Sequence, residues 1–337
     1  MKLLKLFLLS SIMILLFSLC GKSPVDSEIE NPIDLNEERL LIVRDSYSKG
    51  FNEINTIKPD GTGLHVAAHY TFDKNKYYPE NYLSARWSPD KTKIVAQGGP
   101  GSTIDIRPLW LMDIYGRLLH KLYWSGTHQV LSHDGEYILF QGIPCGYNVF
   151  SVNIDGTDEK LVYQVGDSTT FNLYDISASG EHILGTEKLY YTNEEGKLAN
   201  TESEILKIHL ETGDKLYLTD NELSDACPHY NCDETKIAYF CRDIPGEVTI
   251  NNVTNVYVMS SDGSNKRRLT NETKPNRIWP YMAWSPDGKK IAFQKFNQMT
   301  TSERQIDIFI VDIDTGELFQ LTDTAKDTVR NLVMDWK

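Results

Sequence analysis

The chain has 337 residues, with 34 Lys and Arg against 47 Asp and Glu, which gives a formal net charge of −13. Its 40% hydrophobic and 11% aromatic residues are enough for a sizeable core, so wholesale disorder is excluded. The acidic balance disfavours a nucleic-acid partner, because phosphate neutralisation needs Lys and Arg clustered on one face. The length predicts one large domain or two small ones.

The first twenty residues have the pattern of an export signal. Lys2 and Lys5 precede residues 6–19, a run whose only polar residues are three serines, and Cys20 follows at once. The run is shorter than the roughly 20 apolar residues that a membrane helix needs, although an uncleaved anchor remains an alternative. The segment resembles a bacterial lipoprotein signal, which implies that residues 1–19 are removed and that Cys20 carries lipid.

We expect residues 20–38 to form a flexible, acidic tether. After Cys20, this segment contains two prolines and six acidic residues but few large apolar side chains. Gly21 resembles the residue found after the lipidated cysteine in lipoproteins that are sent on to the outer membrane of Gram-negative bacteria. We therefore expect an exported protein, anchored in the cell envelope by lipid, whose folded domain comprises residues 39–337.

Two sequence units alternate through the rest of the chain. A turn followed by an apolar strand recurs at Ser88, Ser132, Ser177, Asn231 and Ser285, at intervals of 44, 45, 54 and 54 residues. Between these turns lies an alternating strand, often an Asp-Gly or Thr-Gly reversal, and another strand. Together the units predict four short antiparallel strands per repeat of roughly 50 residues, the period of a β-propeller blade. The predicted fold is all-β, a six-bladed β-propeller of four-stranded antiparallel blades.

Two segments carry a resemblance to a known family. Residues 284–293, WSPDGKKIAF, and residues 256–270, VYVMSSDGSNKRRLT, are similar to the WD40-like Tol-type repeat. That repeat forms the propeller of the periplasmic protein TolB and of prolyl oligopeptidases, and the resemblance covers residues 40–337. It implies architecture and not activity, since the Gly-x-Ser-x-Gly motif of serine hydrolases is missing from the sequence.

The resemblance also implies how the ring closes. In this family the strand of the Trp-Ser-Pro-Asp-Gly unit is the innermost of its blade. Residues 330–337 would then be the inner strand of a blade whose other strands are residues 39–45, 52–57 and 62–68. The C-terminal strand would join the N-terminal blade and leave no open sheet edge.

Candidate site residues of a propeller lie where inner strands converge on the central channel. His128 and His229 are near such strands, and Asp175 and Asp225 could join them. This set would suit a metal-assisted polysaccharide lyase or a lactonase. The alternative is that these side chains merely line a wet channel. We expect the second, with no catalytic residue, no metal and no cofactor.

A second set of candidates lies near a channel mouth. Arg277 and Trp279 precede an inner strand, Tyr281 follows on the same side as Trp279, and Arg330 begins the closing strand. An aromatic face beside guanidinium groups suits an anionic glycan or an acidic or carboxy-terminal peptide. Alternatively, Trp279 fills a gap between blades and the arginines pair with neighbouring aspartates. The expected function is a non-catalytic scaffold that binds an envelope protein or such an anionic ligand.

The cysteines leave two alternatives. Cys227 and Cys241 fall near opposite each other on strands joined by a turn at residues 233–234, which permits a disulfide in an exported protein. A register slip of one residue would leave both thiols unpaired. The Cys spacing does not favour zinc.

Overall fold

The computed structural model describes residues 33–46, 49–71, 82–99, 106–142, 147–192, 198–200, 202–242, 253–273, 281–299, 304–324 and 329–337. Residues Leu35–Lys337 form one compact unit. In the described part every regular element is a strand. No helix there is long and apolar enough to cross a membrane.

Four sheets of the described residues are separate blades, each built on four strands. They are β4 (Tyr82–Trp87) to β7, with β5 (Lys93–Gly98), β6 (Leu109–Asp113) and β7 (Leu118–Tyr123); β8 (Gly126–Leu131), β9 (Tyr137–Gly142), β10 (Val149–Asn153) and β11 (Lys160–Tyr163); β12 (Thr169–Ile176), β13 (His182–Thr192), β15 (Glu204–His209) and β16 (Lys215–Tyr217), with β14 (Leu198–Asn200) added to β13; and β17 (Ser224–Tyr230), β18 (Lys236–Arg242), β19 (Thr254–Ser260) and β20 (Arg267–Arg268).

The other described strands form one eight-stranded sheet. It contains β21 (Met282–Trp284), β22 (Lys290–Met299), β23 (Arg304–Asp312), β24 (Leu318–Gln320), β25 (Arg330–Trp336), β1 (Leu40–Ser46), β2 (Phe51–Ile57) and β3 (His65–Thr71). The prediction of six separate four-stranded blades is therefore wrong. The reason is the length of β23, whose Ile306 reaches β25 and forms a parallel pair with Arg330. This pair joins two groups of antiparallel strands into one mixed sheet.

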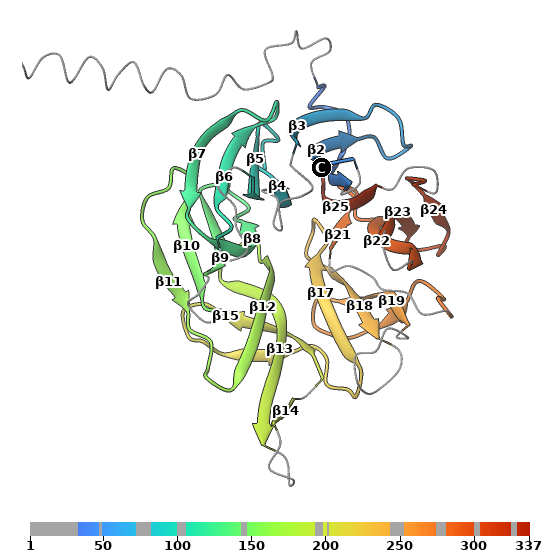
Figure 1. Ribbon diagram of the computed structural model, residues 1–337. Coiled ribbons are helices and arrows are strands. Elements are labelled where there is room, and N and C mark those ends of the chain that lie inside the picture. The colour runs from blue at the N-terminus through green and yellow to red at the C-terminus, as the bar shows by residue number, and fades with distance from the viewer. Residues whose placement is uncertain are drawn as a thin grey trace, which may run out of the picture. The chain divides into compact units, whose positions relative to one another are not determined.

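The propeller arrangement itself is confirmed (Figure 1). We call β4, β8, β12, β17, β21 and β25 the inner strands. Contacts link β4 to β8, β8 to β12, β12 to β17, β17 to β21, β21 to β25, and β25 back to β4. The inner strands thus surround a single axis. The hairpin of β13 and β14 projects away from that axis.

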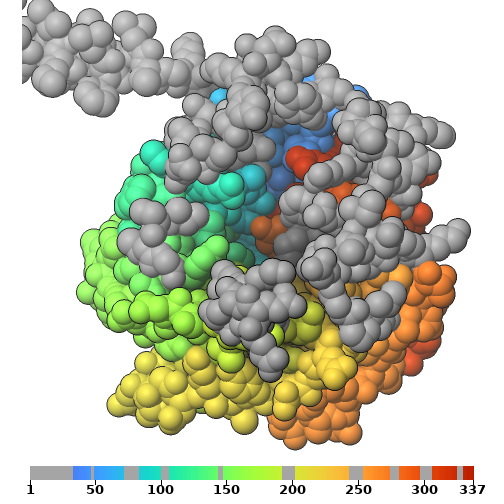
Figure 2. All heavy atoms as spheres, turned by 60° about the horizontal axis from the view of Figure 1, so that its bottom comes forward, coloured from blue at the N-terminus to red at the C-terminus, as the bar shows by residue number. Residues whose placement is uncertain are grey.

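The C-terminal strand closes this ring by pairing with the first strand. β25 runs antiparallel to β1, from Leu40 opposite Trp336 to Asp45 opposite Arg330. The expected pairing of residues 330–337 is confirmed, and Figure 2 shows the two segments side by side, blue against red. β3 begins at residue 65 and not 62, because residues 58–62 form a turn closed by a backbone hydrogen bond of 3.0 Å.

The recurring serine of the turn unit has a structural cause. The Ser88 hydroxyl donates to Asp90 Oδ1 over 2.5 Å, and that carboxylate accepts the backbone N–H of Thr92. The same Ser–Asp bond recurs from Ser132 to Asp134 and from Ser285 to Asp287. Each bond fixes the reversal between an inner strand and the second strand of its group.

Buried amides join some groups of strands to the next. Three second strands carry a glutamine that is 4% exposed or less, at Gln97, Gln141 and Gln294. The bonds run from Gln97 Nε2 to Gly126 O, from Gln141 Nε2 to Phe171 O, from Leu173 N to Gln141 Oε1 and from Val333 N to Gln294 Oε1. We call them amide staples. They tie β5 to β8, β9 to β12 and β22 to β25, and they satisfy backbone groups that would otherwise be buried without partners.

Candidate functional site

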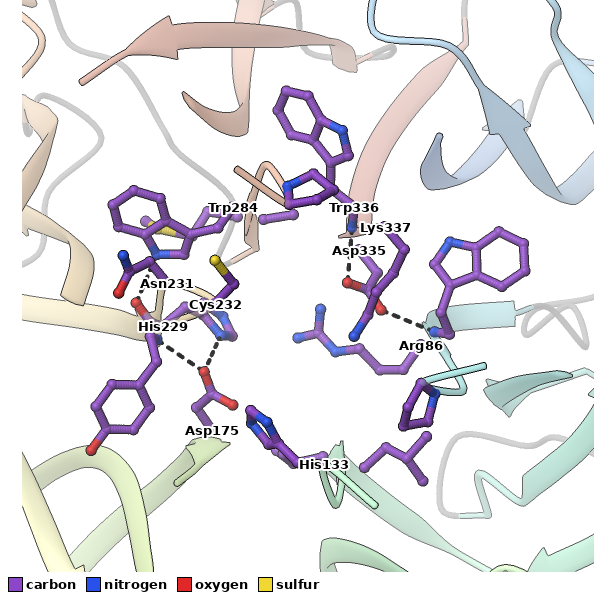
Figure 3. A pocket seen from close by; sticks show the side chains of 18 of the residues that line it. Arg86, His133, Asp175, His229, Asn231, Cys232, Trp284, Asp335, Trp336 and Lys337 are labelled. Atoms are coloured by element: carbon purple, nitrogen blue, oxygen red, sulfur yellow. Dashed lines mark hydrogen bonds and ion pairs between the residues drawn. The ribbon is translucent and has the colours of Figure 1, made fainter. Parts of the chain in front are cut away.

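The inner strands enclose a pocket of about 310 Å³ on the axis (Figure 3). Every inner strand contributes to its wall, and the turns that follow these strands form its rim. We call it the axial pocket. Its charged and imidazole side chains are Arg86, His133, Asp175, His229, Asp335 and Lys337. A pocket of this size at the convergence of the strands is the default ligand site of such a fold.

One position recurs around the pocket wall, two residues before the turn serine or its equivalent. Arg86, Val130, Asp175, His229, Ala283 and Asp335 occupy it on successive inner strands. The cyclic order of the strands places Arg86 across the axis from His229, and Asp175 across from Asp335, as Figure 3 shows. The wall therefore has one diagonal of nitrogen groups and one of carboxylates.

Both carboxylates are held by backbone N–H groups. Asp335 accepts from Trp336 N over 2.8 Å and from Trp87 N, on the next inner strand, over 3.0 Å. Asp175 accepts in the same way from its own neighbour, at 2.9 Å, and from Tyr230 N on β17, at 3.0 Å. Burial alone would raise the pKa of Asp175, but hydrogen bonding by the His229 ring and these N–H groups lowers it. Both side chains join inner strands, and Asp175 stays ionised.

His229 has a ring nitrogen without a partner. The residue is 7% exposed, and its Nε2 atom is buried with no hydrogen bond to any described residue. Its Nδ1 atom lies 3.7 Å from Asp175 Oδ2, and its backbone oxygen accepts from Trp284 Nε1. Burial lowers the pKa of the imidazole, so the ring is neutral at neutral pH.

Arg86 brings a positive charge to the opposite wall. It donates from Nη1 to the backbone oxygen of Met334, and its guanidinium extends toward the middle of the pocket (Figure 3). Of the residues that the structure describes, none forms a salt bridge with it. A guanidinium has five N–H donors, so most of its donors remain for a ligand.

A smaller cavity of about 30 Å³ shares Arg86 and Tyr174 with the axial pocket and is also lined by His128 and Tyr281. The Tyr174 ring makes edge contacts with His128, at 5.7 Å between centroids, and with His229, at 6.1 Å. Burial lowers the pKa of His128 to about 4. The structure thus brings the predicted residues His128, His229 and Tyr281 together.

Tyr174 was missed in the sequence because of β-bulges. The ladder of β12 and β13 shifts register between Leu173 and Asp175, which leaves Tyr174 out of the pairing. Similar shifts interrupt β4, β8 and β17 before the same wall position. A bulge re-aims one side chain and breaks the period of two, so alternation cannot find such a residue.

Other predicted site residues lie elsewhere. Arg330 forms a two-point ion pair with Asp45, at 2.6 Å for each bond, and does not line the axial pocket. Asp225 is 1% exposed, accepts from the Asn221 side chain at 2.9 Å and is also outside the pocket wall. Arg277, Trp279 and Cys20 fall outside the described residues.

Cys227 and Cys241 are both buried and not disulfide-bonded, so the disulfide suggested by the sequence is not formed. The register places Asp225, and not Cys227, opposite Cys241. A bulge follows Ala226, and Cys227 there has a φ of 55°. The two thiols consequently pack into different core clusters on either side of their sheet.

The lyase and lactonase alternative needs a metal, and the side chains present do not fit one. Within the described ranges, no group of three or more His, Cys, Asp or Glu residues could hold a metal ion. The two carboxylates of the axial pocket are already bonded to backbone N–H groups.

No protein-family model and no curated protein matches this sequence. Among solved structures, TolB from Acinetobacter baumannii is similar with a TM-score of 0.64 at 16% identity, over 90% of this chain and 67% of that one. A protein from Agrobacterium tumefaciens assigned as TolB has a TM-score of 0.57 at 14% identity, over 89% and 99%. A puromycin-hydrolysing peptidase from Mycobacterium tuberculosis has a TM-score of 0.52 at 13% identity, over 86% and 46%. At these identities the likeness concerns the fold alone. The chain is a β-propeller whose structural neighbours include TolB-like propeller proteins.

Proposed function

We propose that this chain is a non-catalytic binding protein of the cell envelope, which captures an acidic partner at its axial pocket. The observation that carries the proposal is Arg86, a guanidinium that extends into the pocket without a salt bridge to any described residue. A guanidinium that has no direct ion pair can donate paired hydrogen bonds to the carboxylate of a ligand. The likeness to TolB-like propellers supports a binding scaffold in general terms.

The state of the other polar groups favours binding over catalysis. A general acid or base needs a pKa near the working pH and freedom to exchange its proton with a substrate. Asp175 and Asp335 are bonded to backbone N–H groups on two strands each. His128 and His229 have pKa values lowered by burial. The pocket therefore offers fixed charges and hydrogen-bond groups.

The location rests on the first twenty residues. We place the protein at the outer membrane, with lipid on Cys20 as its anchor, since Lys2 and Lys5 precede a run that is apolar apart from three serines, and Gly21 follows the cysteine. The Cys20→Ser variant should be released from membranes, because the remaining acidic chain is repelled by anionic lipid. Retention of this variant after a carbonate wash would favour an uncleaved apolar anchor instead.

Partner capture tests the binding function. The tagged full-length protein, its Arg86→Gln variant and an Arg117→Gln control would be used to capture proteins and glycans from the native envelope. Arg117 is a suitable control because its side chain is 78% exposed and pairs only locally, with Asp113. We expect Arg86→Gln to lower capture by about tenfold or more, as for loss of a charged hydrogen bond, and Arg117→Gln to leave it unchanged. Full capture by a folded Arg86→Gln protein would contradict the proposal.

A further inference from the structure

We infer that the axial pocket recognises the last residue of a peptide, with the terminal carboxylate on Arg86 and the backbone N–H of that residue on His229 Nε2. The inference rests on the proposed function and specifies its ligand. It follows from three features of the pocket wall: the donor on one side, the acceptor opposite, and the apolar side chains between them.

The donor side is Arg86. One of its N–H groups is bonded to the backbone oxygen of Met334, and the guanidinium extends into the pocket. A guanidinium is planar and can donate two parallel hydrogen bonds to one carboxylate. The carboxylates of Asp175 and Asp335 accept from backbone N–H groups on neighbouring strands, and among the described residues neither forms an ion pair with Arg86.

The acceptor side is His229, across the axis. Its Nδ1 atom is 3.7 Å from the negative Asp175 carboxylate, which favours the ring proton on Nδ1. Burial and the nearby Arg86 charge lower the pKa of the imidazole, so only one ring proton is present. Nε2 then carries a lone pair, and this atom is buried without a partner among the described residues. An N–H or O–H of a ligand would satisfy it.

The rest of the wall favours a peptide over a sugar acid. Val130 and Ala283 occupy the wall positions on the remaining diagonal, where a hydroxyl-rich ring would need polar partners. The indoles that line the pocket cannot stack on a sugar, because Trp87, Trp284 and Trp336 are 3%, 7% and 3% exposed. A volume of about 310 Å³ lies at the low end for ligand pockets and suits a chain end. The C-terminal residue of a peptide carries both a carboxylate and a backbone N–H, and it is short and partly apolar.

A matched set of small ligands tests the inference on the full-length protein. The probes are N-acetyl-trialanine as the free acid, as its C-terminal amide, and as the acid with the last nitrogen methylated, with galacturonic acid as a sugar carboxylate. We expect the amide to bind roughly 10- to 100-fold more weakly than the acid, and the N-methyl acid about 3- to 10-fold more weakly. Galacturonic acid should bind more weakly than the peptide acid.

Two variants assign the contacts. Arg86→Gln should remove the preference for the acid over the amide, whereas His229→Phe should remove the preference for the acid over its N-methyl form. Equal binding of acid and amide by the wild-type protein would overturn the inference, as would tighter binding of galacturonic acid. The wild-type comparison needs no variant to fold. Envelope capture that depends on Arg86 without any binding of these peptides would refute this inference and leave the proposed function standing.

Discussion

Neighbouring inner strands are joined in two different ways. Three junctions use the amide staples of Gln97, Gln141 and Gln294, which lie on second strands away from the axis. The β4–β8 junction also has a bond between inner strands, from Gln129 Nε2 to the Ser84 hydroxyl. The other three junctions use side chains on the inner strands themselves. Asp175 ties β12 to β17, the Trp284 indole ties β21 to β17, and Asp335 ties β25 to β4.

The difference explains which wall side chains are engaged in joining inner strands. An amide staple joins the groups of β4, β8 and β21 to the next inner strand. The wall residues of these three strands, Arg86, Val130 and Ala283, therefore need not form that connection. Where no such staple exists, Asp175 and Asp335 make the bond themselves. Arg86 is thus the one charged wall residue on a strand whose group is tied to the next inner strand by an amide staple. The Arg86 side chain itself bonds to the Met334 oxygen on the preceding inner strand, β25.

Removal of the closing strand should have the largest effect on the ring. Deletion of residues 330–337 removes β25 together with its pairing to β1, the amide staple at Val333 and the Asp335 bond to β4. We expect cooperative thermal unfolding to disappear, because an inner strand is lost and a sheet edge opens at the axis. A melting transition equal to that of the full chain would show that the ring holds without this strand.

Loss of an amide staple should come next. Gln141→Leu leaves the Phe171 oxygen and the Leu173 N–H buried without partners, so we expect a destabilisation of about 3 kcal/mol in urea unfolding. Gln320→Leu is the control, because this exposed residue on β24 bonds only to a nearby backbone oxygen. It should change stability by about 0.5 kcal/mol or less. Equal effects of the two substitutions would refute the structural role of the staple.

Loss of the Asp335 junction on the axis should destabilise the fold less than loss of an amide staple. Asp335→Asn keeps one acceptor oxygen but turns an NH₂ group toward either Trp87 N or Trp336 N. We expect a loss of about 1.5 kcal/mol in the same assay, from one unsatisfied N–H. Asp158→Asn, at a side chain that is 63% exposed, is the matched control and should be nearly silent. A loss larger than that of Gln141→Leu would reverse the ranking of the two kinds of junction.

Acid should lower the stability that the Ser–Asp turn bonds contribute to the fold. The hydrogen bond from Ser88 lowers the pKa of Asp90 from 3.8 to about 2. Between these values the unfolded chain binds more protons than the folded one, so stability falls as the pH drops through this range. The Asp90→Asn variant cannot take up that proton, and its unfolding free energy should depend less steeply on pH between about 4 and 2. Identical slopes for wild type and variant would contradict the lowered pKa.

Reduction should have no effect at all. Cys227 and Cys241 lie on either side of the sheet whose two junctions lack amide staples, and they are not disulfide-bonded. A reducing agent should therefore leave the melting temperature unchanged within error. A fall in melting temperature on reduction would show that a disulfide, and not the axial side chains, strengthens this part of the ring.

Much of the fold could be predicted from the sequence, because turns and strands have local causes. The bonds from Ser88 to Asp90 and from Ser285 to Asp287 lie within three residues, so their pattern repeats visibly. The merging of β23 with β25 depends on one extra pairing, Ile306 with Arg330, between segments far apart in the ring. No local pattern encodes such a contact.

The candidate site was predicted only in part, for a similar reason. His128, His229 and Tyr281 were identified from their places near inner strands, and the structure brings them together. Tyr174 depends on a bulge, which alternation cannot reveal. Arg86 stands within the recurring turn unit, but nothing in that unit marks its place on the pocket wall.

The seam between β25 and β1 also sets the order in which this protein can fold. Asp45 and Arg330, which are bonded across it, lie 285 residues apart in the sequence. During synthesis the first three strands emerge from the ribosome before β25, which completes their sheet, has been made. Contacts of such long range slow folding. Because closure needs this last strand, the ring is completed only when residues 330–336 can pair with β1.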